Sequence, residues 1–410
     1  MKILSIETSC DETAVCIVEA SGGLESPTFT VLGNALFSQV ELHKEFGGVF
    51  PTLAKREHAR NLIPLLEKVL KESNLISNFQ FPISKQNFEN KEEEISKILE
   101  KEKGLFESFK NFLENKDKPE IDLISVTSGP GLEPALWVGI VFAQALGKLW
   151  NIPVLGINHM EGHIASVLID RSDEFKILNL KFKNNAINFP ALAVLISGGH
   201  TEIVKMKSWD KYEVIGETVD DAVGEAFDKT ARMMGLPYPG GPEVSHLAGL
   251  ARVQNLPHKA KLPRPMIHSK NLNFSFSGLK TAVLYYIRDN FQGEHQKMTE
   301  NDKADLAREF EESILDVLKE KTEEALNLTH AKTLIVAGGV IASQKIQEVF
   351  KEFEGIYPDL KVKFPTKLLA TDNALMIAAA TYIKTVRSPE VLSNPQAIVA
   401  KGNLRYKNVV

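Results

Sequence analysis

Cysteine is almost missing from this 410-residue sequence, which contains only Cys10 and Cys16. Two cysteines cannot form a disulfide framework or a cysteine-based metal site, and so low a count is typical of a reducing compartment. Long hydrophobic runs are also missing, since the longest ones, such as residues 190–196, are far too short to span a membrane. The N-terminus lacks the organisation of a signal peptide. We therefore expect a cytoplasmic protein without membrane association.

Positive charge is not in excess either. Lysine and arginine total 48 and acidic residues 53, which gives a formal net charge of −5. RNA binding would therefore need a local basic surface. One candidate is the stretch 244–288, which has no Asp or Glu, carries Phe274 and Phe276, and contains seven basic residues: Arg252, Lys259, Lys261, Arg264, Lys270, Lys280 and Arg288. It fits either contact with a phosphate backbone or an internal surface that binds acidic side chains.

The hydrophobic pattern predicts an α/β protein. Strands are expected at 1–7 and 13–20 around the polar loop 8–12, and again at 189–196 and 202–206 around residues 197–201, which suggests a faint structural duplication. Strands at 121–127 and 333–337 and helices at 57–73, 135–150 and 374–382 complete the pattern. The domains are predicted as an N-terminal lobe (1–155), a C-terminal lobe (156–385) carrying most of the metal and nucleotide site, and a tail (386–410) packing back on the first lobe.

The segment 77–118 has a different texture, because it is rich in lysine and glutamate and contains a single glycine, Gly104. Its apolar residues could form a helical stripe. We interpret it as an inserted, charged appendage that is helical or partly disordered and has no chemistry of its own.

Residues 159–163 (HMEGH) contain two histidines four positions apart, which lie on one face of a helix and could bind one metal ion. The pair is also compatible with two ordinary polar residues unless a third ligand comes from elsewhere. Zinc proteases place a glutamate directly after the first histidine. Here Glu161 is third and would point about 200° away from His159. The motif therefore favours metal binding and argues against that protease mechanism.

Asp372 precedes an Ala/Met-rich helix and could be a helix cap. As a third ligand it would complete a two-histidine, one-carboxylate site that leaves open positions for substrate and suits iron(II) or zinc.

Two diglycines, Gly198-Gly199 and Gly338-Gly339, follow apolar strands. Glycine lets backbone amides approach a phosphate or a base closely, although tight turns need glycine anyway. Neither a P-loop nor a dinucleotide-binding fingerprint occurs. A helix expected at 218–235 carries Asp220, Asp221, Glu225 and Asp228. This acidic group is either a solvated face or a source of ribose ligands, of which Asp228 is the best placed.

Nine segments together closely resemble the TsaD family of tRNA threonylcarbamoyladenosine transferases. They occur in the family's order: 6–13 (IETSCDET), 128–132 (SGPGL), 159–163 (HMEGH), 197–201 (SGGHT), 224–229 (GEAFDK), 238–242 (YPGGP), 274–280 (FSFSGLK), 337–340 (AGGV) and 371–373 (TDN). The resemblance implies a two-lobed, actin/hexokinase-like (ASKHA) ATPase fold with a nucleotide cleft between the lobes. It implies transfer of the threonylcarbamoyl group of L-threonylcarbamoyladenylate to N6 of adenosine 37, in tRNAs reading codons that begin with A, with release of AMP.

The resemblance also implies site residues. The metal ligands would be His159, His163 and Asp372, with one divalent ion, iron(II) first and zinc second. Asp11 and Glu12 would lie close to the chemistry. The substrate-binding positions would be Leu195, Ile196, Ser197, Gly198, Gly199, Asp228, Gly241 and Ser343. The expected partners are the tRNA anticodon loop, the adenylate, and TsaB-like and TsaE-like proteins.

Two departures from the family pattern stand out. Ser343 replaces the usual asparagine after the second diglycine, which puts adenylate binding there in question, because a hydroxyl is shorter and has no amide. The 77–118 segment is longer than the family's usual connection. The alternatives to the transferase are a metalloprotease, a small-molecule kinase of the same fold, and a scaffold subunit without activity.

Overall fold

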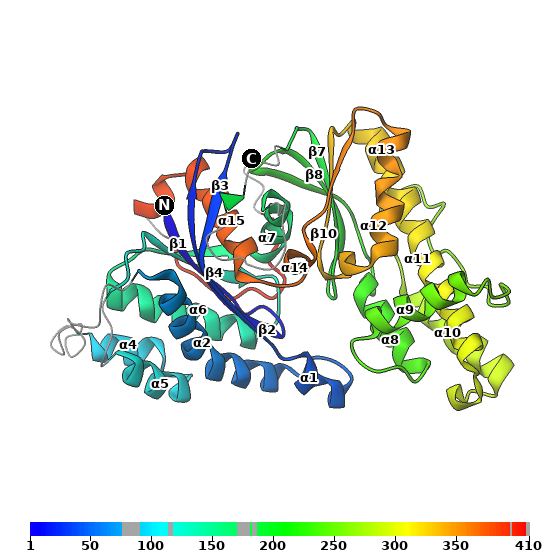
Figure 1. Cartoon of the computed structure of the whole chain (residues 1–410), viewed down its shortest axis with the longest axis horizontal. Coiled ribbons are helices and arrows are strands. Elements are labelled where there is room, and N and C mark those ends of the chain that lie inside the picture. Colours follow the sequence, from blue (N-terminus) through cyan, green and yellow to red (C-terminus); the bar gives the residue numbers. More distant parts are fainter. Residues whose placement is uncertain (76–90, 114–117, 170–180, 183–186, 394–395, 407–410) are drawn as a thin grey trace. The chain divides into compact units, whose positions relative to one another are not determined.

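A computed structural model of the chain describes residues 1–75, 91–113, 118–169, 181–182, 187–393 and 396–406 (Figure 1). It has two compact units. Unit 1 comprises Met1–Gln39, Val49–Ala186 and Asp372–Tyr406, and unit 2 comprises Val40–Gly48 and Ile187–Thr371. Each unit has its own mixed β-sheet with helices packed against it. The predicted α/β class is therefore confirmed.

The sheet of unit 1 has six strands. Their spatial order is β5 (Val154–Asn158), β4 (Leu123–Gly129), β1 (Lys2–Glu7), β2 (Glu12–Ser21), β3 (Thr28–Ser38) and β6 (Lys181–Phe182). β1 pairs antiparallel with β2 and parallel with β4, and β4 pairs parallel with β5. The predicted hairpin at 1–20 is thus confirmed. The pleat turns Leu4 and Ile6 to one face and Ser5 and Glu7 to the other.

Helices cover both faces of this sheet. One face packs on α2 (Pro51–Ser73) and α6 (Glu133–Trp150), and the other on α15 (Ala374–Arg387), which also lies beside α7 (His159–Ala165) (Figure 1). Short elements complete the unit: α4 (Glu92–Ile98), α5 (Lys103–Leu113), the 3₁₀ turn Ser166–Leu168 and α16 (Glu390–Ser393).

The described part of the predicted appendage is helical and has its own place in the core. Ile95 of α4, Leu99 just after it and Phe109 of α5 are fully buried. The Phe109 ring packs edge-on against Phe142 of α6 at 6.0 Å. Burying a phenylalanine contributes about 2–3 kcal/mol. These helices therefore pack against unit 1 and are not a purely solvated excursion. Residues 76–90 and 114–117 of the appendage lie outside the described residues.

Unit 2 repeats the strand order of unit 1. Its five strands follow the order β11 (Lys361–Lys363), β10 (Thr333–Ala337), β7 (Ala191–Ile196), β8 (Thr201–Ser208) and β9 (Lys211–Glu217). β7 pairs antiparallel with β8 and parallel with β10, as β1 does with β2 and β4. The predicted duplication is confirmed, and this duplicated α/β arrangement is the one expected for an actin/hexokinase-like fold.

The helices of unit 2 surround a large apolar core. They are α1 (Val40–His43), α8 (Val223–Met233), α9 (Gly240–Val253), α10 (Ser277–Phe291), α11 (Glu300–Thr329), α12 (Gln344–Lys351), α13 (Phe353–Ile356) and α14 (Lys367–Ala370), with 3₁₀ turns at Lys44–Phe46, His295–Lys297 and Gly339–Ala342. α11 starts with a capping box between Thr299 and Asp302, which satisfies N–H groups at its first turn.

The boundaries between the units differ from the predicted ones. β5 continues the parallel part of the unit 1 sheet, so α7, which follows it directly, stays in unit 1 and not in the lobe predicted to begin at 156. α15 packs against β1, β2 and β4, so it also belongs to unit 1. The chain beyond it contacts the same unit, because Lys401 N–H donates to the Ser128 carbonyl.

Candidate functional site

The candidate metal ligands lie at the carboxyl end of the parallel strands of unit 1. His159 directly follows β5, and Glu7 is the last residue of β1. Asn158 caps α7, since its side chain accepts hydrogen bonds from the N–H groups of Met160 and Glu161. The cap fixes the start of the helix, so the two histidines project from consecutive turns of one face.

The two histidines converge on Asp372. Asp372 Oδ1 lies 3.4 Å from His159 Nε2 and 3.2 Å from His163 Nε2, and the two imidazole rings meet edge to face at 4.7 Å. His163 is fully buried and His159 nearly so. All three belong to unit 1. The three side chains predicted as metal ligands are therefore brought together.

Asp372 is not the helix cap. The side chain of its neighbour Asn373 accepts the N–H of Met376 and caps α15, which leaves the Asp372 carboxylate directed at the histidines. Burial alone would raise the pKa of Asp372, but His159 and His163 outweigh it and hold the pKa far below its usual range. Asp372 is thus a permanent anion beside two imidazoles.

Glu7 is a functional residue that the sequence reasoning missed. Its Oε2 lies 3.2 Å from His159 Nδ1 and accepts the Thr127 hydroxyl at 2.5 Å, and its Oε1 accepts the N–H of Ser9. A carboxylate on Nδ1 fixes the imidazole so that Nε2 faces the metal position, a common arrangement behind metal-binding histidines. The only signal in the sequence is a glutamate that ends a mostly apolar strand.

The residues fit a divalent metal. Both ring nitrogens of His163 are buried and make no hydrogen bond of normal geometry, although Nε2 lies 3.2 Å from Asp372 Oδ1, and a bound cation would accept the lone pair of Nε2. The ligand atoms of His159, His163 and Asp372 all lie within 4.8 Å of one another. Burial would lower the pKa of His159, but Asp372 and then Glu7 raise it overall, as expected for an imidazole between two carboxylates. Two imidazoles and one carboxylate suit iron(II) or zinc.

Asp11, in the β1–β2 turn, and Glu12, the first residue of β2, lie beside this site. Asp11 is 8% exposed, and Glu12 Oε1 accepts the Ser38 hydroxyl at 3.2 Å. Burial, then Asp11, then Asp372 raise the pKa of Glu12 well above its usual range, so the acids of this turn and of the metal site act on one another. Burial and Asp11 also raise the pKa of Cys10, which disfavours a thiolate nucleophile there.

The predicted substrate residues of unit 2 gather at the equivalent edge of its sheet. Ser197 follows β7 and Gly338 follows the parallel neighbour β10. Gly224, at the start of α8, packs so closely that a Cβ there would lie 2.7 Å from Gly198 Cα. In contrast, a Cβ on Gly198 or Gly199 would meet no described atom within 4 Å. The space beside the backbone of these two glycines is therefore open. Leu195 and Ile196 are fully buried in β7.

The acidic residues near α8 have separate roles. The helix begins at Val223, later than the predicted 218, so Asp220 and Asp221 precede it. Asp221 and Glu225 both pair with Lys229. Asp220 accepts the N–H groups of Phe276 and Ser277 at the start of α10. Of the four acidic residues, only Glu225 and Asp228 therefore lie on α8, and Asp221 and Glu225 share one lysine.

Asp228, Gly241 and Ser343 lie at helix starts or beside them. Asp228 Oδ1 accepts the N–H of Gly240 at 2.7 Å, which joins α8 to the first turn of α9, where Gly241 follows. A Cβ on Gly241 would meet no described atom within 4 Å. Ser343 precedes α12, but its hydroxyl does not cap that helix.

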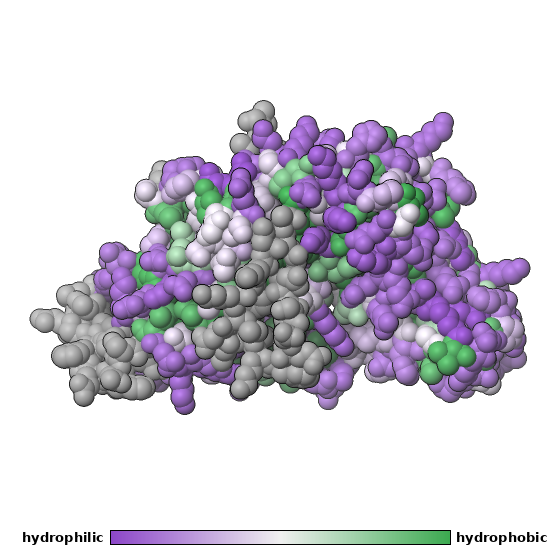
Figure 2. Space-filling model, turned by 45° about the horizontal axis from the view of Figure 1, so that its top comes forward, coloured by the Kyte–Doolittle hydropathy of each residue, from purple (hydrophilic) through white to green (hydrophobic). Residues whose placement is uncertain are grey.

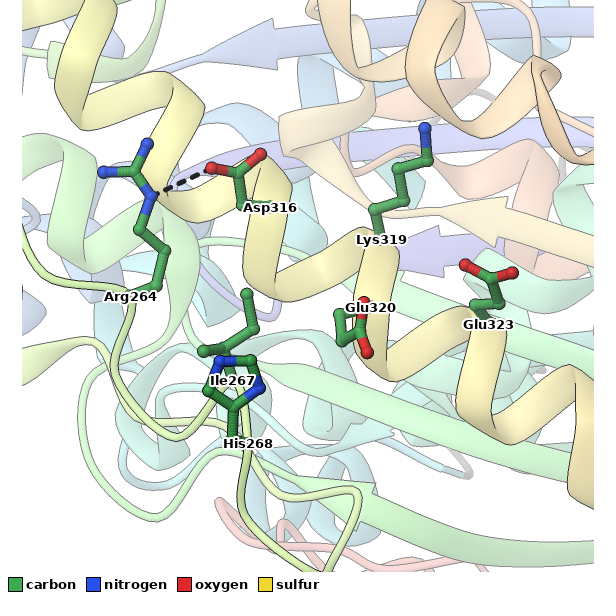
Figure 3. A pocket seen from close by; sticks show the side chains of 7 residues that line it. All are labelled: Arg264, Ile267, His268, Asp316, Lys319, Glu320 and Glu323. Atoms are coloured by element: carbon green, nitrogen blue, oxygen red, sulfur yellow. Dashed lines mark hydrogen bonds and ion pairs between the residues drawn. The ribbon is translucent and has the colours of Figure 1, made fainter.

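The arginines of the basic stretch mostly face protein carboxylates. Arg252 pairs with Glu311 and Glu312, and Arg264 with Glu309 and Asp316, all on α11; Figure 3 shows the Arg264–Asp316 pair. Phe274 and Phe276 are fully buried, so they are not platforms for bases. The internal-surface alternative is correct for this part. Lys259, Lys261 and Lys270 remain exposed.

The same arginines form ion pairs with a second cluster of possible metal ligands. His258, Glu309 and Glu312 also come close enough to one another to hold a cation. However, Glu309 already pairs with Arg264 and Glu312 with Arg252, so this group is neutralised by protein cations.

Comparison with known proteins agrees with these features. The family model described as "TsaD: tRNA N6-adenosine threonylcarbamoyltransferase" matches residues 30–78 and 107–379, which leaves most of the appendage unmatched. The tRNA N6-adenosine threonylcarbamoyltransferase of Herminiimonas arsenicoxydans is 38% identical over 407 residues, covering 98% of this chain and 97% of the relative. That of Burkholderia ambifaria (strain MC40-6) is 39% identical over 410 residues, with the same coverage.

Solved structures give more distant matches. Component A of (R)-2-hydroxyglutaryl-CoA dehydratase from Acidaminococcus fermentans matches with a TM-score of 0.44 and 10% identity, covering 94% of this chain and 99% of the other. Full-length HypF in its phosphate- and nucleotide-bound form matches with a TM-score of 0.47 and 11% identity, covering 97% of this chain and 47% of the other.

The family match and the full-length relatives, together with the α/β fold and the histidine–carboxylate site, define an enzyme of the transferase class. The chain belongs to the TsaD family, the tRNA N6-adenosine threonylcarbamoyltransferases. It is a tRNA-modifying enzyme that makes threonylcarbamoyladenosine. No helix among the described residues is long and apolar enough to cross a membrane, and the face seen in Figure 2 carries its hydrophobic residues in small separate groups.

Proposed function

We propose that this chain transfers the threonylcarbamoyl group of L-threonylcarbamoyladenylate to N6 of adenosine 37, in tRNAs reading codons that begin with A, and releases AMP. The reaction is inferred from family membership. Its dependence on a metal ion is inferred from the convergence of His159, His163 and Asp372 in unit 1.

We assign the metal position to His159, His163 and Asp372, with iron(II) as the first candidate and zinc as the second. When bound there, a divalent ion supplies Lewis-acid polarisation of a substrate oxygen. Glu7 holds the imidazole of His159 through Nδ1, and both histidines are buried.

The chain's own residues have the other tasks. The adenylate is a mixed anhydride that is already activated, so the enzyme must hold it, stabilise the departing phosphate and align a weak amine nucleophile. Asp11 is assigned to accept the proton from N6, and Glu12 to support it. Leu195 and Ile196 through their backbone, together with Ser197, Gly198, Gly199, Asp228, Gly241 and Ser343, are assigned to the adenylate.

The tRNA is expected to present its anticodon loop with adenosine 37 out of its stack. Lys259, Lys261 and Lys270 are the exposed cations proposed to meet phosphates, since the arginines of that stretch are paired. The proposed partners are TsaB-like and TsaE-like proteins, and the proposed location is the cytoplasm. The protease alternative is not favoured, because Glu161 stands third in the motif on α7 and does not directly follow His159, where a zinc protease has its general base.

The test is a transfer assay with synthetic threonylcarbamoyladenylate and an unmodified tRNA transcript carrying adenosine 37, with and without a TsaB-like protein. Nuclease digestion and mass spectrometry detect the modified nucleoside. We expect product with this transcript and none with a matched transcript carrying guanosine 37. Equal incorporation into both transcripts, or none into either with the partner present, would overturn the proposal.

A further inference from the structure

His58 is a fully buried histidine of α2 to which neither the metal site nor the predicted substrate residues give a role. Its Nε2 lies 3.0 Å from the carbonyl oxygen of Cys10, and its Nδ1 lies 2.7 Å from the hydroxyl of Thr13. A carbonyl oxygen can only accept, so Nε2 donates to Cys10. Nδ1 shares a hydrogen bond with the Thr13 hydroxyl and also lies 3.4 Å from Gln39 Nε2, so both ring nitrogens are engaged.

The contacts with Cys10 and Thr13 lie on either side of Asp11. A third contact holds Asp11 itself, because the N–H of Gln39, just beyond β3, donates to the Asp11 carbonyl at 3.0 Å. The turn between β1 and β2 is therefore held at Cys10 and Asp11, and the start of β2 is held at Thr13. Two of the three depend on the imidazole of His58.

The same turn reaches the metal position from its other end. The Ser9 hydroxyl lies 3.2 Å from His159 Nδ1, and the Ser9 N–H donates to Glu7. A displacement of the turn at Cys10 would therefore move Asp11 relative to His159, while the histidine itself is held independently by Glu7 and by the cap of α7.

We infer that His58 is a positioning residue for the transfer: through the Cys10 carbonyl and the Thr13 hydroxyl it holds Asp11 where its carboxylate can take the N6 proton. The inference rests on the proposed function. A proton acceptor must lie within hydrogen-bond distance of its donor, and a misplacement of about 1 Å can cost about 100-fold in rate.

Two amide variants separate the two hydrogen bonds of His58. The amide nitrogen of His58→Gln comes close to the position of Nε2 and can still donate to Cys10. The amide oxygen of His58→Asn comes close to the position of Nδ1 and can accept from Thr13, but its side chain stops short of Cys10. Ser5→Ala is the control, because it removes another buried hydrogen bond on β1, the one to Ser125, away from the turn.

The measurement is the single-turnover rate of transfer from saturating threonylcarbamoyladenylate to tRNA. We expect His58→Asn to lose about 10- to 100-fold and His58→Gln to stay within about threefold of the unmodified chain. Bound metal and the adenylate concentration for half-maximal rate should not change in either. Ser5→Ala should keep its rate. Hydrogen exchange should rise at the amides of residues 10–13 in His58→Asn alone.

A double-variant cycle tests whether the effect passes through Asp11. Asp11→Ala with His58→Asn should be no slower than Asp11→Ala alone. The inference would be overturned if His58→Asn, His58→Gln and Ser5→Ala lost transfer rate equally and in proportion to their fall in melting temperature. It would also be overturned if the rate losses of Asp11→Ala and His58→Asn were additive in the double variant. If the original chain makes no product, the proposed function itself fails. Unchanged exchange at residues 10–13 would refute the holding role even then.

Discussion

Glu7 ends β1 and His159 directly follows β5, 152 positions further along the chain, yet Glu7 Oε2 lies 3.2 Å from His159 Nδ1. The other ring nitrogen of His159 faces Asp372. One imidazole therefore joins a buried carboxylate behind it to the metal position in front, and the orientation of the ring does not depend on the ion.

The first prediction concerns this pair. Glu7→Gln should weaken metal binding by about 10- to 100-fold, because the amide no longer fixes the imidazole and no longer raises its basicity. Metal retained after dialysis against graded chelator, measured by mass spectrometry, checks this. The control is Asp122→Asn, which changes an exposed carboxylate just before β4 in the same unit. Equal metal retention by Glu7→Gln and the original chain would contradict the assignment of Glu7.

A second prediction concerns the glycines of unit 2. Gly224→Ala would place a Cβ 2.7 Å from Gly198 Cα, and overpacking of this kind costs about 1–3 kcal/mol in unfolding free energy. Gly199→Ala meets no described atom within 4 Å and should leave the melting temperature unchanged. It should raise the KM for the adenylate if the turn holds the substrate. A Gly199→Ala variant with normal melting and normal KM would remove that turn from the binding site.

Much of the fold could be predicted from the sequence, because periodicity reports burial. The hairpin of β1 and β2, the strand β10 and the helices α2, α6 and α15 follow from apolar spacing. The sequence does not predict β3, although burial alternates along it from Thr28 to Ala35. Its residues do not alternate strictly between polar and apolar, and a glycine interrupts them. The extent of unit 1 was missed because strand pairing, not chain order, decides it.

The site could be predicted only in part. His159, His163 and Asp372 have chemical types and a spacing that mark a metal site. Glu7 and His58 do not, since a single glutamate in a strand and a single histidine in a helix are common in any protein. Their roles depend on contacts of 3.2 Å or less with residues far away in the sequence. Strand pairing and helix packing create these contacts, and the local sequence does not report them.

A third prediction concerns Lys321, which is fully buried and donates to the carbonyls of Ser269 and Asn271. Lys321→Met would remove the hydrogen bonds that tie α11 to this half-buried loop, at a cost of about 1–3 kcal/mol in unfolding free energy. Lys319→Met on the same helix removes only a partly exposed pair with Glu352 and should cost less than about 0.5 kcal/mol. Calorimetric melting of both variants decides it. Similar melting temperatures would contradict the anchoring role of Lys321.

The fourth prediction concerns pH. Partial burial would raise the pKa of Asp220, but the hydroxyls of Ser275 and Ser277 and the N–H groups of Phe276 and Ser277 outweigh it and lower the pKa. The charged form is therefore favoured in the folded state, so the stabilisation is present above the ordinary carboxyl pKa of about 4 and is lost as the pH falls through the lowered folded value.

Asp220→Ala should accordingly destabilise the start of α10 by about 1 kcal/mol at neutral pH, within the range for capping residues. The difference in melting temperature from the original chain should shrink as the pH falls below about 4. A difference that stays constant over that range would show that the charge of Asp220 does not contribute.

The central claim is that transfer depends on a divalent metal held by His159, His163 and Asp372. The most direct measurement is the rate of threonylcarbamoyladenosine formation by chelator-stripped protein as iron(II) or zinc is added back, with His163→Ala alongside. We predict that activity returns as about one metal ion binds per chain, and that His163→Ala neither binds the ion tightly nor regains activity. Full activity of the stripped protein, or of a metal-free His163→Ala variant with an unchanged melting temperature, would contradict the account.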